Sequence, residues 1–238
     1  GWATGIEIGE QTGITVQNCI IEYNENHGIS IYDSTYCTVS DSIIRYTTRV
    51  GDSGGHGIII HGGSSYITIE NNTVSDNDWY GIEIFGSSNN TVSNNRVSGN
   101  MEVGIRIARD EDRGLPAEEN LIRANTVTAT HVREGGDWAV GIYCFADRNY
   151  IRDNTVTGND VFGIQLWRSN FCEITGNEVS QTRMLSGATW GGIGIELPES
   201  NHNYIYNDTV ENNDHIGIVL NGASYNCLLY TSDAADEG

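Results

Sequence analysis

Three features of this 238-residue sequence predict an all-β parallel solenoid, in which short strands stack coil upon coil. The first is a Gly-Ile-x-Ile/Leu unit (GIxI) that recurs nine times at intervals of 22 to 37 residues, with Cys replacing the last apolar residue once. The second is a pair of apolar positions that follows each of the first eight units, five residues apart. The third is a series of asparagines in register between these two positions. No segment shows the periodicity of a helix.

The GIxI units predict the first strand of every coil. They begin at Gly5, Gly28, Gly57, Gly81, Gly104, Gly141, Gly163, Gly194 and Gly217. Two further strands are predicted around the paired apolar positions, as at Val92 and Val97. One coil cannot bury its own apolar face, whereas stacked coils can. The sequence therefore predicts a single-stranded parallel β-helix with three parallel sheets and about nine coils, wound in the right-handed sense that parallel crossovers favour.

Asparagines mark the tight turn between the second and third predicted strands. Five consecutive coils carry one at the same position, namely Asn72, Asn95, Asn125, Asn154 and Asn177. We expect these side chains to form an inward ladder, because each amide can bond both the backbone and its neighbour in the next coil. We also expect these asparagines to adopt the left-handed backbone conformation that a sharp turn requires.

The combined GIxI and asparagine pattern, from Gly5 to Asn226, resembles the right-handed parallel β-helix repeats of the pectin-lyase-like superfamily. It is most similar to NosD-like and other carbohydrate-associated β-helix proteins. The resemblance implies a secreted or cell-surface location and a polysaccharide partner. One fold hosts many activities, and the sequence matches neither the Asp-rich motifs of polygalacturonases nor the Asp-Pro-His-Asp motif of alginate epimerases. No residue is therefore assigned as catalytic by motif.

Insertions interrupt the repeat only beside the GIxI strands. The turn before the strand is lengthened at 47–56, 130–140 and 182–193, and the loop after it at 108–119. Long loops on a rigid scaffold often carry binding residues, which favours the GIxI sheet as the ligand face. A tight turn that cannot accept insertions would produce part of the same bias.

The outer face of the GIxI sheet can be read from the sequence, because alternate residues of a strand point to opposite sides. We expect this face to be exposed. Its aromatic rings suit pyranose faces, and its polar groups suit sugar hydroxyls. The predicted substrate-binding residues are His61, Glu83, Phe85, Trp138, Phe145, Gln165, Trp167, Trp190 and Glu196. Aromatic residues also favour strands without any ligand, and that alternative stays open.

Eight of the twelve arginines fall on this sheet or its flanking loops. They suit a carboxylated or sulfated glycan, because guanidinium groups bind such anions in a bidentate manner. Pairing with the many neighbouring Asp and Glu residues explains them equally well. An anionic polysaccharide is thus one predicted partner.

Arg106 and Tyr143, on neighbouring coils, are the candidate catalytic residues. In a uronide lyase, Arg106 would neutralise the substrate carboxylate and Tyr143 would take the adjacent proton. A surface ion pair between Arg106 and Glu83, worth under about 1 kcal/mol, is the alternative. Glu83 and Glu196 cannot form a hydrolytic pair, because four coils separate them by about 19 Å, beyond the roughly 9.5 Å of an inverting pair.

Asp110 and Asp112 are the candidate metal ligands, since carboxylate oxygens suit Ca²⁺; a solvated acidic loop is the alternative, and no other cofactor is predicted. Four cysteines outside the C-terminal tail are expected to be free and mostly buried. Cys37 and Cys172, five coils or about 24 Å apart, lie too far from one another for a disulfide.

Composition excludes several functions. The formal charge of −20, with all twelve basic residues Arg, argues against a nucleic-acid partner. No apolar run approaches the roughly 18 residues of a membrane span. We expect residues 1–226 to be a β-helix domain truncated at both ends. Residues 227–238 resemble a translated sequencing adapter and are expected to be non-native. The oligomeric state stays open.

The sequence thus predicts an extracellular protein that interacts with polysaccharide through its GIxI sheet. One hypothesis is an enzyme, with a uronide lyase preferred to a glycoside hydrolase. A second is a non-catalytic glycan-binding or cell-surface module, and a third is a structural stalk without a ligand.

Overall fold

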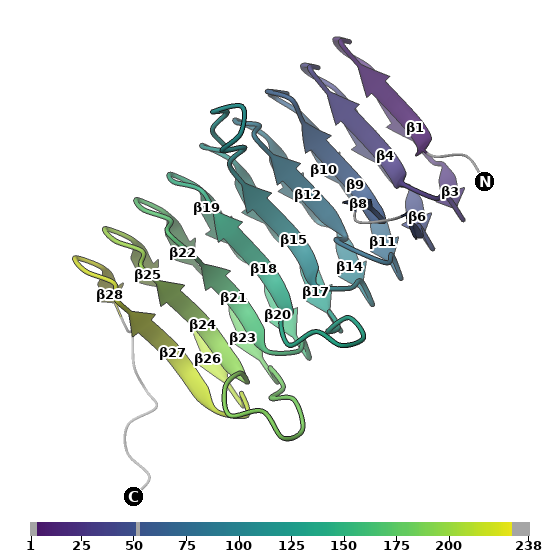
Figure 1. The fold of residues 1–238 in the computed structure, drawn as a ribbon. Helices are drawn as coiled ribbons and strands as arrows, with labels where there is room; N and C mark the ends of the chain where they lie inside the picture. Colours follow the sequence, from purple (N-terminus) through teal and green to yellow (C-terminus); the bar gives the residue numbers. More distant parts are fainter. Residues whose placement is uncertain (1–3, 51–52, 230–238) are drawn as a thin grey trace, which may run out of the picture.

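The computed structural model describes residues 4–50 and 53–229. Within them the chain is all β, and three parallel sheets run along a stack of coils (Figure 1). The predicted parallel β-helix of nine coils is confirmed. Among the described residues, no helix exists that is long and apolar enough to cross a membrane.

The first sheet consists of the nine GIxI strands in chain order, and each strand between the two end strands is paired with those of the coils before and after it. They are β1 (Thr4–Gly9), β4 (His27–Tyr32), β9 (His56–His61), β12 (Ile82–Phe85), β15 (Val103–Ala108), β18 (Val140–Phe145), β21 (Phe162–Leu166), β24 (Ile193–Pro198) and β27 (Ile216–Asn221).

The second and third sheets consist of three-residue strands, each centred on one apolar position of the predicted pair. The second sheet contains β2 (Thr15–Gln17), β5 (Thr38–Ser40), β10 (Thr68–Glu70), β13 (Thr91–Ser93), β16 (Leu121–Arg123), β19 (Tyr150–Arg152), β22 (Glu173–Thr175), β25 (Tyr204–Tyr206) and β28 (Cys227–Leu229). The third contains β3 (Ile20–Glu22), β6 (Ile43–Arg45), β11 (Thr73–Ser75), β14 (Arg96–Ser98), β17 (Thr126–Thr128), β20 (Thr155–Thr157), β23 (Glu178–Ser180) and β26 (Thr209–Glu211). Strand β28 begins the suspected tail, and residues 230–238 lie outside the described part of the chain.

Crowding inside the coil explains why glycine opens the GIxI unit. A Cβ on Gly104 would lie 2.4 Å from Cγ1 of Val127 and 2.6 Å from the carbonyl oxygen of Gly141 in the next coil. The isoleucines that follow, Ile105 and Ile107, are fully buried and in register with their counterparts in the neighbouring coils. The core is therefore a set of aliphatic stacks along the solenoid. The cysteines are free, as predicted, and three of them are buried.

The predicted asparagines are stacked by hydrogen bonds at the tight turn. Nδ2 of Asn95 donates to Oδ1 of Asn125, and Nδ2 of Asn125 donates to Oδ1 of Asn154, each at 3.0 Å. Nδ2 of Asn125 also donates to the carbonyl oxygen of Val92 in the preceding coil, at 2.9 Å. The side chains thus satisfy turn groups that would otherwise be buried without partners.

The prediction that the ladder asparagines are left-handed is wrong. The positive φ lies one residue earlier in the turn, for example at Asn94 (56°) and Ala124 (55°). Because that preceding residue makes the bend, the ladder asparagine directs both its N–H and its amide along the stack. The N–H of Asn95, for instance, donates to Oδ1 of Asn125 at 2.9 Å.

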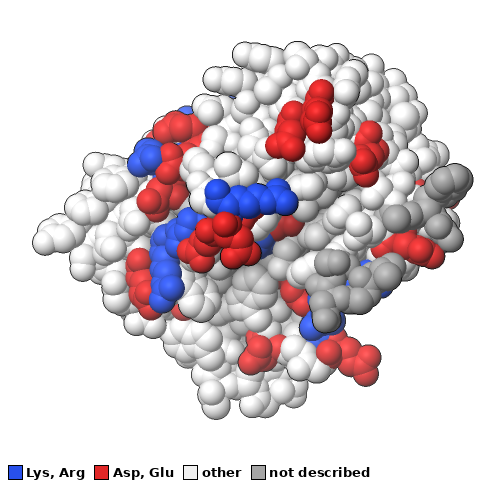
Figure 2. Space-filling view, turned by 45° about the horizontal axis from the view of Figure 1, so that its top comes forward, with Lys and Arg blue, Asp and Glu red and all other residues white. Residues whose placement is uncertain are grey.

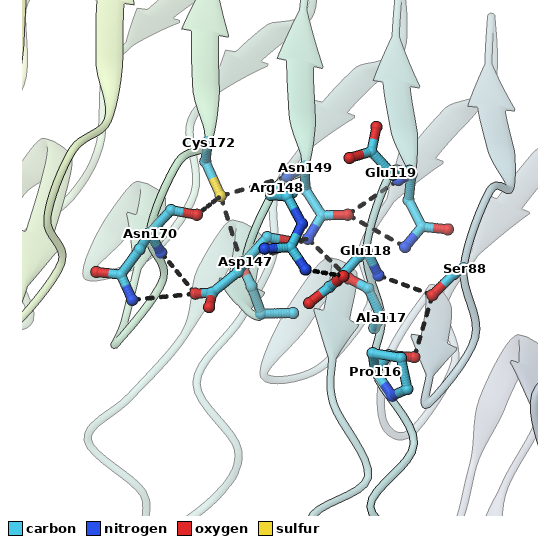
Figure 3. Close-up of polar contacts among 12 residues, drawn as sticks. Ser88, Pro116, Ala117, Glu118, Glu119, Asp147, Arg148, Asn149, Asn170 and Cys172 are labelled. Carbon is cyan, nitrogen blue, oxygen red and sulfur yellow. Dashed lines mark hydrogen bonds and ion pairs between the residues drawn. The ribbon is translucent and has the colours of Figure 1, made fainter.

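A second ladder, which was not predicted, occupies the turn between the first and second sheets. Nδ2 of Asn90 donates to Oδ1 of Asn120, and Nδ2 of Asn120 donates to Oδ1 of Asn149, each at 3.1 Å. Figure 3 shows the next rung, where the sulfur of Cys172 accepts the N–H of Asn149 at 3.4 Å. A cysteine therefore interrupts the series of amides.

The lengthened loops project beside the first sheet, as Figure 1 shows. The loops between β17 and β18 and between β23 and β24 leave one edge of the stack, and the loop between β15 and β16 leaves the opposite edge. The remaining lengthened turn contains a short antiparallel pair, β7 (Arg49–Val50) and β8 (Ser53–Gly54). These loops border the outer face of the first sheet.

Candidate functional site

The x positions of the GIxI strands are largely buried, so the prediction of an exposed face is wrong there, whereas most outer positions directly after the motif are half-buried or exposed. Glu83 and Glu196 are each 4% exposed, and Tyr143 is 8% exposed. Strand alternation places these side chains outward as expected. However, rings and aliphatic side chains from the flanking turns, including Trp79 and Trp138, pack into a second apolar cluster over the sheet. Two hollows remain open on this face.

The larger opening, the tryptophan hollow, has a volume of about 660 Å³ and lies over β21, β24 and β27. Its lining includes Trp138, Phe162, Gln165, Trp167, Leu185, Trp190, Glu196, Pro198 and Asn221. It brings together five of the predicted substrate-binding residues from two strands and two lengthened loops. Trp167 and Trp190 remain 40% and 44% exposed, so their rings are open to a ligand.

Two hydrogen bonds connect three polar groups at the floor of the tryptophan hollow. Nε1 of Trp138 donates to Oε1 of Gln165 at 3.2 Å, and Nε2 of Gln165 donates to Oε2 of Glu196 at 2.5 Å. Burial raises the pKa of Glu196, although the hydrogen bond from Gln165 opposes this effect. The floor thus offers a carboxyl group and an amide beneath aromatic walls.

The second opening, the histidine hollow, has a volume of about 500 Å³ and lies over β4, β9, β12 and β15. It is lined by His27, Gly54, His56, Ile59, His61, Trp79, Tyr80, Glu83, Phe85, Arg106, Asp110, Asp112 and Arg113. Six residues of the predicted site meet here: His61, Glu83, Phe85, Arg106, Asp110 and Asp112. Tyr143 and Phe145 line neither hollow. Tyr143 packs edge-on against Trp138, and Phe145 lies beneath Arg109.

Glu83 is the centre of the histidine hollow. Its Oε2 lies 2.9 Å from Nε2 of His56, and its Oε1 forms an ion pair with Nη1 of Arg106. Burial disfavours the carboxylate, but the interaction with His56, which includes a hydrogen bond, together with Arg106, outweighs it and lowers the pKa of Glu83 to about 2. Glu83 is therefore an ionised carboxylate whose two oxygens are bound by His56 and Arg106, and it cannot serve as an acid at neutral pH.

The structure argues against Tyr143 as a base. Burial raises its pKa to about 12, despite the opposing charge of Arg106. Its backbone is paired with that of Arg106, as predicted, but the phenol is not part of either hollow. Arg106 itself is 19% exposed, and the rings of Tyr80, Phe85 and Tyr143 surround its guanidinium group. Its pair with Glu83 is thus buried, not the surface pair considered from the sequence.

Most arginines beside the first sheet have a carboxylate partner. In Figure 2, blue and red side chains lie next to one another across this face. The pairs are Arg106–Glu83, Arg109–Glu111, Arg113–Asp110, Arg133–Glu102, Arg148–Glu118, Arg168–Glu199 and Arg183–Asp160. The arginines therefore neutralise local carboxylates, which favours the salt-bridging alternative over a cluster of arginines dedicated to an anionic ligand.

Asp110 and Asp112, the candidate calcium ligands, have different environments. Asp110 is buried and accepts the N–H of Arg113 at 3.0 Å, which closes its own loop. Asp112 is exposed. No cluster of three or more His, Cys, Asp or Glu side chains suited to a metal ion occurs in the described part of the chain. Calcium binding stays a prediction.

Sequence reasoning considered His56 only together with His61, as a base or a metal pair, and it missed His27, Trp79 and Tyr80 of the histidine hollow. His27 and His56 directly precede GIxI units in successive coils, and β4 and β9 pair them in register. That recurrence in the sequence is a signal that could have revealed them. The two aromatic residues stand directly before the unit at Gly81 and fold back over the sheet.

Structural comparison finds the same kind of fold in several solved proteins. The catalytic domain of Agl-KA superposes with a TM-score of 0.66 at 16% identity, over 95% of this chain and 45% of that one. The A-module of the mannuronan C-5 epimerase AlgE4 from Azotobacter vinelandii gives 0.64 at 11%, over 93% and 57%. Pectate lyase Pel9A gives 0.56 at 11%, over 85% and 68%. At these identities the likeness shows the fold alone.

The chain spans about half the length of the first two of these proteins. A sequence comparison with curated proteins gives no match. The model of the right handed beta helix region matches residues 4–179 and 140–234, which together cover nearly the whole chain. The protein belongs to the right-handed β-helix family.

Proposed function

We propose that the protein binds a polysaccharide along the outer face of its first sheet, with a sugar unit held in the tryptophan hollow. One observation carries this proposal: Trp138, Trp167 and Trp190 converge on a polar floor of Gln165 and Glu196. Indole rings pack on the apolar faces of sugars, while carboxyl and amide groups bond hydroxyls.

The fold neighbours support the same class of ligand, since one is described as a mannuronan epimerase and another as a pectate lyase. A polymer of this kind also suits a secreted or cell-surface protein. The long axis of the first sheet offers a track on which several sugar units can lie, because neighbouring strands repeat at about 4.8 Å.

Binding of neutral, uronic and sulfated polysaccharides, measured by calorimetry with and without Ca²⁺, tests the proposal. We expect Trp167→Ala to weaken binding at least tenfold, because it removes an open aromatic wall. Phe171→Ala is the matched control, since that ring is 54% exposed but stacks on His202 outside both hollows. Equal weakening by both substitutions, or none by Trp167→Ala, would refute the assignment of the hollow.

A uronide lyase is a second candidate function, and the histidine hollow favours it. Arg106, although paired with Glu83, and the more exposed Arg113 line this hollow, where a guanidinium group can meet a substrate carboxylate. The test is ultraviolet absorbance of unsaturated products from uronic polymers. Product formation would establish a lyase, and reducing ends without unsaturation would indicate a hydrolase. Binding without either product would indicate a non-catalytic module.

A further inference from the structure

Three side chains on consecutive coils form a continuous hydrogen-bonded series in the histidine hollow. Oε2 of Glu83 on β12 lies 2.9 Å from Nε2 of His56 on β9. Nδ1 of His56 lies 3.1 Å from Nδ1 of His27 on β4. Glu83 and His56 have side chains only 5% and 6% exposed, whereas His27 is half-buried at the end of the series.

The chemistry of imidazole limits where the protons stand in this series. An ionised Glu83 accepts hydrogen bonds only, so Nε2 of His56 must carry the proton between them. Two imidazole nitrogens at 3.1 Å share one proton. If His56 is neutral, its Nδ1 is the acceptor and Nδ1 of His27 is the donor. Nε2 of His27 then holds a free lone pair.

We propose that Glu83, His56 and His27 form a proton relay in which His27 Nε2 is the base of the histidine hollow. Glu83 and His56 are positioning residues: the carboxylate fixes the tautomer of His56, and His56 fixes that of His27. A base takes this form when a carboxylate orients a histidine that in turn orients the reacting group.

The relay gives a balanced route for the lyase reaction, and in this respect it rests on the function proposed above. Nε2 of His27 takes the proton from the carbon beside the uronate carboxylate, and the C–H electron pair forms a double bond to the next carbon. The bond from that carbon to the glycosidic oxygen breaks, the oxygen takes a proton from water, and the resulting hydroxide finally takes up the proton that the relay has gained. The Nδ1 proton of His27 moves to Nδ1 of His56, which leaves the imidazolium beside Glu83.

The groups around His27 suit a neutral imidazole that awaits a proton. Burial is the main cause that lowers the pKa of His27 to about 4; His56 and His61 on β9 lower it further, while Glu83 on β12 raises it. Arg106, Asp110, Asp112 and Arg113 line the same hollow. A proton that His27 takes up at Nε2 is therefore passed on to His56, which lies beside the carboxylate of Glu83.

Nitrogen-15 NMR of the histidine rings tests the relay without any need for turnover. At pH 7 we expect His56 to be protonated at Nε2 only and His27 at Nδ1 only. A His27 protonated at Nε2 would overturn the proposal, because it would mean that His56 already holds the extra proton. In Glu83→Gln we expect both tautomer patterns to be lost, and their persistence would also count against the relay.

Kinetics form the second arm, with the rate of unsaturated product as the readout. We expect His27→Gln to lower kcat at least 100-fold with KM little changed, the usual contribution of a general base. His202→Gln is the control, since that exposed histidine lies outside both hollows. An unchanged kcat in His27→Gln would refute His27 as the base. If the wild type forms no unsaturated product, the lyase proposal fails, and the NMR result still decides the relay.

Discussion

Asp208 occupies a place in the tight-turn ladder that asparagine holds in the five preceding coils. Its Oδ1 accepts the N–H and the Nδ2 of Asn177, at 2.7 and 2.8 Å, as an asparagine oxygen would. Its Oδ2 is buried without a hydrogen-bond partner. In the preceding rung the equivalent atom is a nitrogen, which donates to the carbonyl oxygen of Ile151 at 2.9 Å. Asp208→Asn should therefore restore a missing donor.

The expected gain in the free energy of unfolding follows from the proton affinity of this carboxyl group. Burial raises the pKa of Asp208 from 3.8 to about 6, against the hydrogen bonds from Asn177. The folded state holds this proton more tightly than the unfolded state. The loss of stability caused by the buried carboxylate is therefore absent below pH 3.8. It grows as the pH rises and is complete above about pH 6. Such a pKa difference corresponds to about 3 kcal/mol, which solvent at this half-buried turn reduces to about 1–2 kcal/mol.

Urea unfolding of the wild type and Asp208→Asn at several pH values provides the assay. We expect the variant to be about 1–2 kcal/mol more stable at pH 7.5 and to lose most of that advantage at pH 3.5. Asp153→Asn is the matched control, because Asp153 is exposed at the same turn two coils earlier and adopts the left-handed conformation that asparagine tolerates. A gain that does not depend on pH, or a loss at pH 7.5, would refute the reasoning.

Other substitutions probe the stack and the buried charges. Asn125→Ala should lower the free energy of unfolding by about 3–5 kcal/mol, because it leaves several buried groups without partners; urea titration would show it. Gly104→Ala should cost about 1–3 kcal/mol by steric conflict with the oxygen of Gly141, measurable as a lower midpoint, whereas an unchanged midpoint would mean that the coil relaxes. Arg106→Ala should lower the free energy of unfolding by about 3–5 kcal/mol, because it removes the guanidinium partner of the buried Glu83 carboxylate. Adding Glu83→Gln should recover much of this loss in a double-mutant cycle. Binding of a uronic polymer should strengthen with added salt, which screens the charge of −20, while a neutral polymer should show no such trend in calorimetry.

Much of the fold could be predicted because each rule repeats in every coil. Each coil must be packed in the same way as its neighbours. The same residue types therefore recur, namely the glycine of GIxI, the two apolar positions and the turn asparagine. The ladder at Asn90, Asn120 and Asn149 was not predicted, because its series changes to Cys172 and loses its chemical uniformity. The left-handed conformation of the tight turn was assigned to the ladder asparagine, although the preceding residue adopts it. Asparagine is compatible with both positions, and only the structure distinguishes them.

The candidate site was predicted less completely, because exposure depends on what folds over a strand. Alternation correctly placed Glu83, Gln165 and Glu196 on the outer face. It carried no information on Trp79 and Trp138, which reach over that face from turns and loops of variable length. A carboxylate predicted to be solvated is thus buried, and its ion pair with Arg106 is a structural element of the hollow.

The spacing of the relay shows why no sequence motif revealed it. His27, His56 and Glu83 lie on three consecutive coils, yet the sequence separates them by 29 and 27 residues because the intervening turns differ in length. A pattern of fixed spacing cannot describe such a set. Strand register places His27 and His56 opposite one another, but Glu83 is opposite Ile59 and reaches His56 across the face of the sheet. Because stacked strands repeat at about 4.8 Å, side chains that meet along the axis are those of adjacent coils. In this solenoid the residues of one chemical site therefore come from several coils, and they can be identified only after the strand register has been assigned.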